Sequence, residues 1–554
     1  MKQGFRQSMA WLHTWSGLVV CWLLFAIFLT GTASYFRQEI QLWMQPELHG
    51  SRPDAFTAQR AYDALRARAP QAQSWNISLP GPRNPVAQVS WRDAGAPAQR
   101  GPGNTMVLDA GTGRELAPRD SNAGNFLYRF HFELYGMERV TGRWIVGIAT
   151  LFMLIGIVTG VVTHKRIFKD FFTLRPRKGH RSWLDGHNAA AVLALPFHVM
   201  ITYSGLLLLM TLLMPWGIDA AYKGDTRAFF AEWGRRGGQA AGAPPADSAP
   251  AAAGASLAPM MDAARAAWGP DQVASIAVTR PGTPQAVVEL RRRGADSLLD
   301  RGASERLRFA ADGSLLPAVP PAAATGPGMV YNVLTALHLV RFADPVVRWI
   351  FFLLGLTGTF MTASGLVLWV VKREPDRRKL GRTPAGHRLV QVLNVAGVAG
   401  MTAAVGALFW ANRLIPADLA GRAQWEIHAF FAVWGASLVH AALRPHRAAW
   451  REQLWLAAAL FGLAPALNAW TGTLHLFDAL GRGDGLLAGM DLTLLALGLT
   501  LAAIARKVGL YRPPPLPATR ARAARPAPAV PAGASAAATP AAAAGRGAGA
   551  GAGA

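Results

Sequence analysis

The 554-residue sequence contains a single cysteine, Cys21, so no disulfide can form within the chain. Acidic residues are also scarce, because 32 Asp and Glu stand against 56 Lys and Arg, a formal net charge of +24. A basic excess of this size is typical of nucleic-acid-binding proteins or of membrane proteins with positive cytoplasmic loops. The positive residues are spread along connections and the C-terminal tail rather than gathered on one folded surface, which argues against nucleic acid as a partner.

Charge is almost missing from eight runs, each of about 20 residues and therefore long enough to cross a bilayer. These runs lie at about 11–35, 142–164, 187–214, 346–371, 389–411, 425–443, 452–471 and 486–505. The first is too long for the apolar core of a signal peptide and is predicted to be retained. Every second connection is rich in Lys and Arg, which predicts that both termini are cytoplasmic and that the membrane lipid surrounds a multi-pass protein.

Two long connections, 36–130 and 215–335, are mixed in polarity and are predicted to fold outside the membrane. Each is expected to contain one amphipathic helix, at 55–70 and at 257–270, packed on a small antiparallel sheet. Strands are expected at 86–91, 104–116, 273–280, 285–293 and 305–316, with hairpin turns at Asp-Ala-Gly and Ala-Asp-Gly. Residues 237–255 are predicted to be a flexible lead-in, and the tail after Tyr511 is predicted to be disordered.

The fold class predicted is an α-helical integral membrane protein with about eight transmembrane helices and two periplasmic α+β insertions. The boundaries expected along the chain are a first span in 1–35, a first insertion in 36–130, spans two and three with their basic loop in 131–214, a second insertion in 215–335, span four in 336–373, four further spans in 374–510, and a basic tail in 511–554.

The first four spans are two copies of one unit. Superposing His13 on His187 places Gly31 on Gly205, 18 residues further along in each copy. Superposing His131 on His338 places a Lys-Arg pair on a Lys-Arg pair, with an offset of 207 at both ends. The repeated unit is therefore a span, an external α+β domain and a second span.

Duplication keeps four histidines, His13, His131, His187 and His338, in matching places at two depths. A structural histidine needs only a hydrogen bond, whereas a bis-histidine metal site requires imidazoles from facing helices. In a membrane, a polar side chain must also be paired with another polar group or serve a function. We therefore predict that His13 and His187 on the cytoplasmic side, and His131 and His338 on the periplasmic side, are axial ligands of two stacked haems. The pairing within each haem is left open.

His198 lies eleven residues after His187, and eleven residues at 100° each complete about three turns, so both are expected on one helix face. Leu24 occupies the equivalent place in the first span, so His198 has no twin. It is expected to bind haem, to carry protons, or to bond a nearby carbonyl. Arg143 and Arg348 flank the outer histidines, as do Arg129 and Arg341; they are candidates for holding haem propionates, with headgroup anchoring as the alternative.

At these residues the chain resembles the PepSY-associated transmembrane helix family, which includes bacterial iron-regulated inner-membrane proteins and ferric-siderophore reductases. The resemblance covers residues 1–373 and rests on "WLHTWSGL" (11–18), "FHFELYG" (130–136), "GRWIVGIATLFMLIGIVTG" (142–160), "DGHNAAAVLALPFHVMITYSGL" (185–206) and "LHLVRFADPVVRWIFFLLGLTGTFMTASGLVLWVVKR" (337–373). It implies an inner-membrane protein with b-type haem, two per chain, that reduces a ferric chelate such as a siderophore on the periplasmic face in iron uptake. The family pattern does not explain the four further spans.

The electron donor is not fixed by any motif. No flavin or nicotinamide fingerprint is present, since "GRGDG" (481–485) lies in a connection and follows no strand. Electrons are therefore expected from a quinol or a separate cytoplasmic partner. Two other functions remain open from the sequence: a non-redox regulator or sensor of the cell envelope, since PepSY domains resemble protease-inhibitory propeptides, and a transporter of an iron chelate.

Overall fold

The computed structural model describes residues 4–93, 95, 103–164, 175, 179–232, 256–294, 298–299, 305–318, 326–472 and 474–511. Within these ranges, seven helices are long and apolar enough to cross a membrane, and one bent pair of helices makes an eighth candidate. The seven are Phe5–Ser34 (α1), Arg139–Thr163 (α5), Pro345–Lys379 (α14), Ala385–Leu414 (α15 to α16), Arg422–Leu443 (α17), His446–Thr471 (α18 and α19) and Gly485–Leu510 (α21). The chain is therefore a multi-pass membrane protein, as predicted.

The bent pair replaces the predicted third span. α7 (His180–Leu193) and α8 (Leu195–Leu208) meet at an angle of 67°, and the one-turn helix α9 (Met210–Leu213) follows. Pro196 stands at the start of α8, and a proline ring inside a helical run removes a hydrogen bond and clashes with the carbonyl one turn earlier. The prediction that His187 and His198 share one face of a straight helix is therefore wrong.

The long span Ala385–Leu414 is not a regular α-helix throughout. It begins as α15 (Ala385–Asn394), continues as a π-helix (Val395–Gly400) and ends as α16 (Met401–Leu414). The shorter helices are α2 (Arg37–Trp43), a 3₁₀ turn (Pro46–Leu48), α3 (Thr57–Arg68), α4 (Ala123–Glu133), α10 (Trp216–Tyr222), α11 (Thr226–Glu232), α12 (Ala258–Trp268), α13 (Gly326–Leu339) and α20 (Leu476–Gly481).

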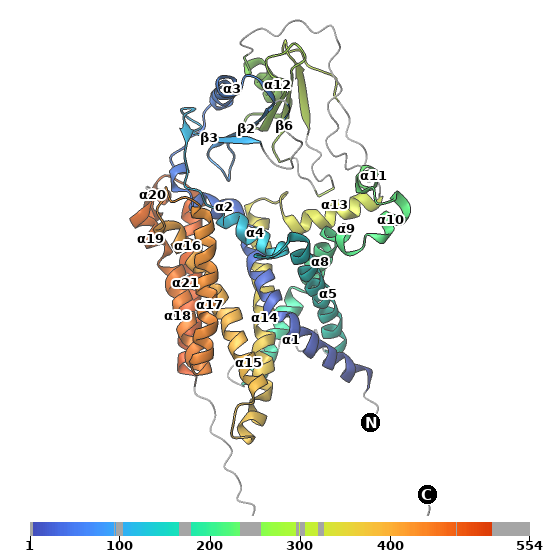
Figure 1. Ribbon diagram of the computed structural model, residues 1–554, viewed down its shortest axis with the longest axis vertical. Helices are drawn as coiled ribbons and strands as arrows, with labels where there is room; N and C mark the ends of the chain where they lie inside the picture. Colours follow the sequence, from blue (N-terminus) through green and yellow to red (C-terminus); the bar gives the residue numbers. More distant parts are fainter. Residues whose placement is uncertain are drawn as a thin grey trace, which may run out of the picture. The chain divides into compact units, whose positions relative to one another are not determined.

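The two insertions build one antiparallel sheet of seven strands in the order β4-β3-β2-β1-β5-β6-β7 (Figure 1). The first insertion contributes β1 (Ala72–Ser78), β2 (Ala87–Asp93), β3 (Asn104–Leu108) and β4 (Glu115–Leu116), and the second contributes β5 (Val273–Thr279), β6 (Val287–Arg292) and β7 (Arg306–Ala310). The expected strands are confirmed, whereas β1 was not predicted. β1 and β5 join the halves, with Ile77 opposite Ile276.

One face of this sheet carries the core. Trp75 and Ile77 of β1, Ile276 of β5 and Leu290 of β6 are buried together with Leu65 of α3, since alternate residues of each strand point to the same face. The predicted helices α3 and α12 supply the other half of this core. The turns also form as expected, because Asp109 and Asp312 each accept a backbone N–H from a residue two or three positions further on.

In the membrane part, α1 packs against α5 and α14, α8 against α5, and α7 against α14. α1 leads into the first insertion at Ser34, so this end of the bundle is called the sheet end and the other the far end. The four C-terminal spans form a group beside α1 and α14 (Figure 1). Gly462 of α18 and Gly498 of α21 touch closely, since a Cβ on Gly498 would lie 2.4 Å from the Gly462 backbone.

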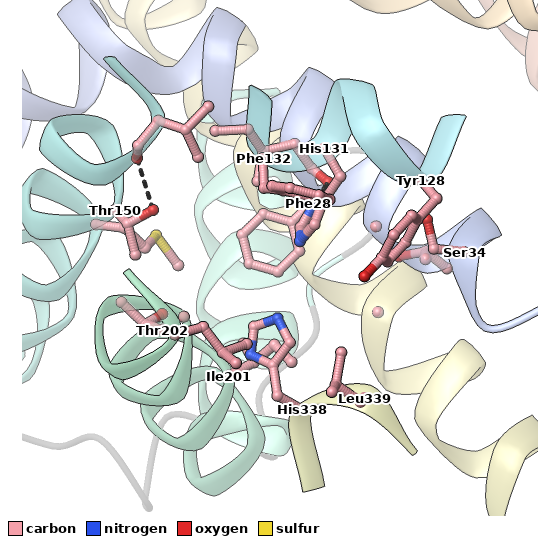
Figure 2. A pocket seen from close by; sticks show the side chains of 18 of the residues that line it. Phe28, Ser34, Tyr128, His131, Phe132, Thr150, Ile201, Thr202, His338 and Leu339 are labelled. Atoms are coloured by element: carbon pink, nitrogen blue, oxygen red, sulfur yellow. Dashed lines mark hydrogen bonds between the residues drawn. The ribbon is translucent and has the colours of Figure 1, made fainter. Parts of the chain in front are cut away.

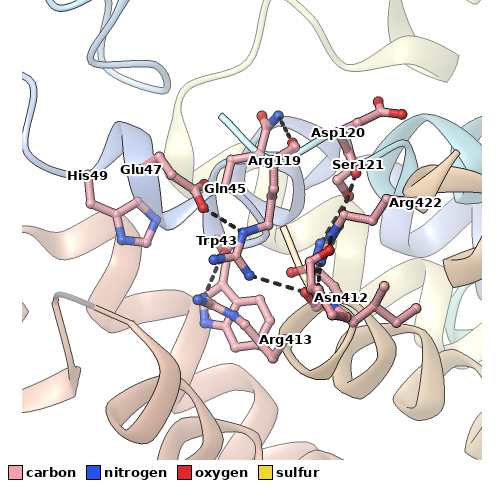
Figure 3. A network of polar contacts seen from close by, with 12 residues as sticks. Trp43, Gln45, Glu47, His49, Arg119, Asp120, Ser121, Asn412, Arg413 and Arg422 are labelled. Atoms are coloured by element: carbon pink, nitrogen blue, oxygen red, sulfur yellow. Dashed lines mark hydrogen bonds and ion pairs between the residues drawn. The ribbon is translucent and has the colours of Figure 1, made fainter. Parts of the chain in front are cut away.

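A buried polar network joins the C-terminal helices to the first insertion (Figure 3). Arg413 of α16 stacks over the ring of Trp43 at 4.2 Å and donates to the Trp43 carbonyl. The indole of Trp43 in turn donates to Asp491 of α21 at 2.8 Å. Buried polar groups of this kind stabilise a fold only when they are hydrogen-bonded, so the two parts are joined by specific contacts.

Several predictions fall on residues outside the described ranges. These are most of the basic loop 164–181, the lead-in 237–255 and the tail after Tyr511.

Candidate functional site

The four repeated histidines form two pairs. The ring centroids of His13 and His187 lie 6.5 Å apart with the planes at 74°, and those of His131 and His338 lie 6.1 Å apart with the planes at 44°. Each pair therefore combines one histidine from each repeat. Figure 2 shows His131 and His338 on opposite sides of one cavity.

The two pairs lie at different depths. His13 is on α1 and His187 on α7, toward the far end, whereas His131 and His338 are on the short helices α4 and α13 that precede α5 and α14. His131 packs on Gly31, near the sheet end of α1. Eighteen residues separate Gly31 from His13 (31 − 13), which corresponds to about 27 Å along an α-helix.

Each histidine ring packs on a glycine of a neighbouring helix. A Cβ on Gly31 would lie 2.5 Å from the ring of His131, a distance that real side chains do not tolerate. The other three contacts are 3.3 Å for Gly160 with His13, 3.4 Å for Gly205 with His338, and 3.4 Å for Gly365 with His187. Glycine is therefore required at position 31 for the ring of His131 to stand where it does, whereas a Cβ at Gly205 or Gly365 would make an ordinary contact and one at Gly160 a tight one.

Three of the rings use Nδ1 to contact a backbone carbonyl that lies four residues before the glycine. The distances are 2.9 Å from His13 to Gly156, 2.8 Å from His131 to Ile27, and 3.1 Å from His187 to Met361. A carbonyl can only accept, so Nδ1 carries the proton and the lone pair is on Nε2. This is the arrangement found around metal-ligating histidines, whose second nitrogen is held by an outer partner.

Hydroxyl groups reinforce these contacts. Thr159 lies 3.2 Å from Nδ1 of His13, Ser364 lies 3.0 Å from Nδ1 of His187, and Ser204 lies 2.9 Å from Nδ1 of His338. Each of these residues stands directly before one of the ring-contacting glycines, as does Thr30 before Gly31. A Ser-Gly or Thr-Gly dipeptide therefore marks the histidine contact in all four helices.

The separation within each pair fits a metal held between two imidazoles. An imidazole nitrogen binds a metal at about 2.0–2.1 Å and lies about 1.1 Å from its ring centroid, so two opposed ligands place the centroids about 6.3 Å apart. Among the described residues, there is no group of three or more His, Cys, Asp and Glu side chains that could hold a metal ion. A site with only two protein ligands suits a porphyrin iron, whose other ligands come from the macrocycle.

The outer pair opens on a cavity of about 310 Å³. Its walls come mainly from apolar side chains of α1, α5 and α8, with His131, His338, Tyr128 and Arg143 as polar groups. Small-molecule sites have this mixture of an apolar lining and a few placed polar groups, usually in cavities of about 300–1,000 Å³.

The arginine predictions have different outcomes. Arg143 lines the cavity and pairs with Glu133 at 2.5 Å, and Glu133 also pairs with Arg129 at 2.8 Å. Arg348 is not among the residues that line this cavity; it is buried and lies 3.5 Å from Glu39, which also pairs with Arg83. Arg341, which was also named as flanking the outer histidines, lines the cavity.

His198 does not join either pair. Its side chain is 1% exposed, its ring contacts Phe28 and Phe197, and it bonds the Ala191 backbone. Nε2 of His198 is buried and has no hydrogen-bond partner in the part of the chain that the structure describes. The carbonyl contact expected as the simplest alternative is thus present. Phe28 and Phe197, which contact this ring, line the cavity, whereas His198 is not among the lining residues.

Comparison with known proteins gives one family. The model of the PepSY-associated TM region matches residues 10–372, which contain all four paired histidines and both insertions. No curated protein matches the chain.

Proposed function

Because the chain belongs to the PepSY-associated TM family, we propose that it is a haem b electron-transfer protein of a bacterial inner membrane. In this proposal it reduces a ferric chelate, such as a ferric siderophore, at the face that carries the sheet. The observation that supports the proposal most strongly is the pairing of His13 with His187 and of His131 with His338 at 6.5 and 6.1 Å.

The two pairs would hold one haem each. Bound in this way, a haem supplies an iron that gains and loses one electron at a time. The chain's own contribution is to fix the ligands, because the carbonyls of Gly156, Ile27 and Met361 hold the Nδ1 proton and leave the lone pair on Nε2. Both levels together would make a path across the bilayer.

His131 and His338 lie on opposite sides of the outer cavity, so the haem that they hold would occupy it, and the chelate would accept the electron from outside the cavity. Arg143 and Arg341 line this cavity, with Glu133 balancing part of the charge. Guanidinium groups bind carboxylates bidentately, so these two residues would hold haem propionates or an acidic chelate. The apolar walls would exclude water and prevent other oxidants from taking the electron.

The orientation proposed rests on the basic connections, because Lys and Arg in short loops favour the cytoplasmic side and these connections belong to the far end of the bundle. The sheet built by the two insertions would then be periplasmic, next to the outer histidine pair. Electrons would enter at His13 and His187 and leave at His131 and His338. Neither an envelope regulator nor a chelate transporter requires two pairs of histidine rings with centroids 6.5 and 6.1 Å apart, so these alternatives do not account for the pairing.

The function is tested by mixing purified, dithionite-reduced protein with a ferric siderophore under anaerobic conditions. We expect the haem spectrum to return to the oxidised form while a colorimetric chelator traps one ferrous ion per electron. His338→Ala should slow this reoxidation at least tenfold, whereas His428→Ala, on α17 away from both pairs, should not. Wild-type protein that keeps its haem but does not reduce any ferric chelate would overturn the substrate assignment.

A further inference from the structure

One ridge of α14 leads from the inner histidine pair toward the far end of the bundle. The Met361 carbonyl accepts from His187, and Gly365, one turn later, packs on the same ring. Residues four apart lie on the same face of a helix, so Trp369 and Arg373 continue this ridge. Trp369 therefore follows Gly365 by one turn, about 6 Å along the axis.

Trp369 lies where the family-matched region meets the C-terminal spans. Cζ of Arg373 lies 3.9 Å from the centroid of its ring and 5.7 Å from that of Trp15 on α1. On the other side, the ring of His387 on α15 is 5.9 Å away. His387 is outside the matched residues 10–372, so the C-terminal helices add a side chain at this point.

Three buried ring nitrogens in this region lack a hydrogen-bond partner among the described residues. They are Nε1 of Trp369, Nε2 of His387 and Nδ1 of His446. The side chain of His387 is only 7% exposed. His446, at the start of α18, interacts electrostatically with both His387 and Glu374, so the polar groups converge. A buried polar group left without a partner costs about 1–3 kcal/mol, so these three ring nitrogens are available to contact a ligand.

The hydrogen-bonding chemistry of these three ring nitrogens limits the class of ligand that can bind them. An indole N–H can only donate, whereas a neutral imidazole nitrogen either donates or accepts. The nearest carboxylate, Glu374, is already paired with Arg377 at 2.6 Å and Arg378 at 2.9 Å. The ligand must therefore offer one oxygen acceptor to Trp369 and a second oxygen to His387.

We propose that Trp369 and His387, with His446 beside them, bind the headgroup of a membrane quinol, which would reduce the haem that the inner histidine pair would hold. This inference rests on the proposed function and assigns a role to the C-terminal spans. In the reaction, both quinol O–H bonds break, and two electrons leave singly to a one-electron acceptor of the ferric haem class. Two protons leave toward the far end through His387 and His446, and the ring becomes a quinone with two C=O groups.

The kinetic test uses purified protein and a short-chain quinol under anaerobic conditions, with haem absorbance as the signal. Trp369→Phe keeps an aromatic ring beside Arg373 but removes the N–H donor, and we expect it to slow quinol-driven reduction about tenfold. His387→Ala should slow it at least as much. The matched controls are Trp470→Phe, at a tryptophan 77% exposed, and His428→Ala. All variants should still be reduced fully by dithionite, which shows that their haem is intact.

A binding test does not depend on haem. A photoreactive azidoquinone should label the peptide that contains His387 in the full-length protein, and excess unlabelled quinone should suppress that labelling. Labelling elsewhere, wild-type rates in Trp369→Phe and His387→Ala, or wild-type haem that dithionite reduces but quinol does not, would overturn the quinol site. A protein without haem that still shows competed labelling at His387 would instead overturn the proposed function and leave the quinol site standing.

Discussion

The ring of His131 lies directly on Gly31, so that a Cβ added at this glycine would be 2.5 Å from the imidazole. Gly31→Ala must therefore displace the ring from its place opposite His338. We expect this variant to lose the outer haem and to keep the inner one, as measured by the pyridine haemochrome assay. Gly435→Ala on α17, where nothing lies within 4 Å of the added methyl group, is the control and should keep both. An unchanged haem content in Gly31→Ala would contradict the ring contact.

Glu133 is the carboxylate that balances Arg129 and Arg143 at the outer cavity. Glu133→Gln leaves an extra positive charge there, and a positive charge favours the ferrous form, which carries one charge fewer. We expect the reduction potential of the outer haem to rise while that of the inner haem stays constant in a spectroelectrochemical titration. Glu452→Gln makes the same change in an ion pair with Arg444 on the C-terminal helices and should shift neither potential. A fall at the outer haem would contradict the assignment.

The pairing of strand β1 with strand β5 is predicted to hold the two insertions together. Ile276 is fully buried opposite Ile77, and an Ile→Ala change in a core costs about 2–5 kcal/mol. We expect Ile276→Ala to lower the free energy of unfolding of the sheet by that amount in denaturant titrations. Leu315→Ala, at an exposed side chain, should change it little. Equal effects of the two substitutions would contradict the burial of Ile276 in this core.

The stability of the first insertion is expected to depend on pH through His49. Burial lowers the pKa of this imidazole to about 4, and its Nε2–H donates to the Leu42 carbonyl at 2.8 Å. An unfolded histidine has a pKa of about 6.5, so the unfolded chain takes up the proton first and stability falls as the pH drops from about 6.5 to 4. His49→Gln should flatten this part of a thermal-unfolding profile. A steeper loss in the variant than in the wild type would contradict the assignment.

Much of the membrane architecture could be predicted from the sequence because the signal is local. A run without charge has few alternatives to a span, and the basic connections divide the runs. The histidine pairs could be predicted from the duplication, since His13 and His187 occupy equivalent positions in the two repeats. The dipeptides before the contacts, Thr159-Gly160 and Ser364-Gly365, were present in the sequence but become meaningful only when the rings are seen packed on them.

Other features depend on contacts between distant residues and could not be predicted in this way. The pairing of β1 with β5 brings together segments about 200 residues apart, and no local pattern distinguishes one shared sheet from two. Arg348 and Arg341 are both near an outer histidine in sequence, yet packing directs Arg348 to Glu39 and leaves Arg341 at the cavity. The bend between α7 and α8, where Pro196 stands, was not predicted, because residues 187–214 were expected to form one span.

The central claim is that two pairs of imidazoles each hold one haem. The most direct measurement is the ratio of haem to polypeptide in protein purified after expression with ample haem precursor, together with the absorbance spectrum of its reduced form. The account predicts a b-type spectrum and two haems per chain, one in His13→Ala, one in His338→Ala and none in the double variant. Colourless wild-type protein, or single variants that still bind two haems, would contradict it.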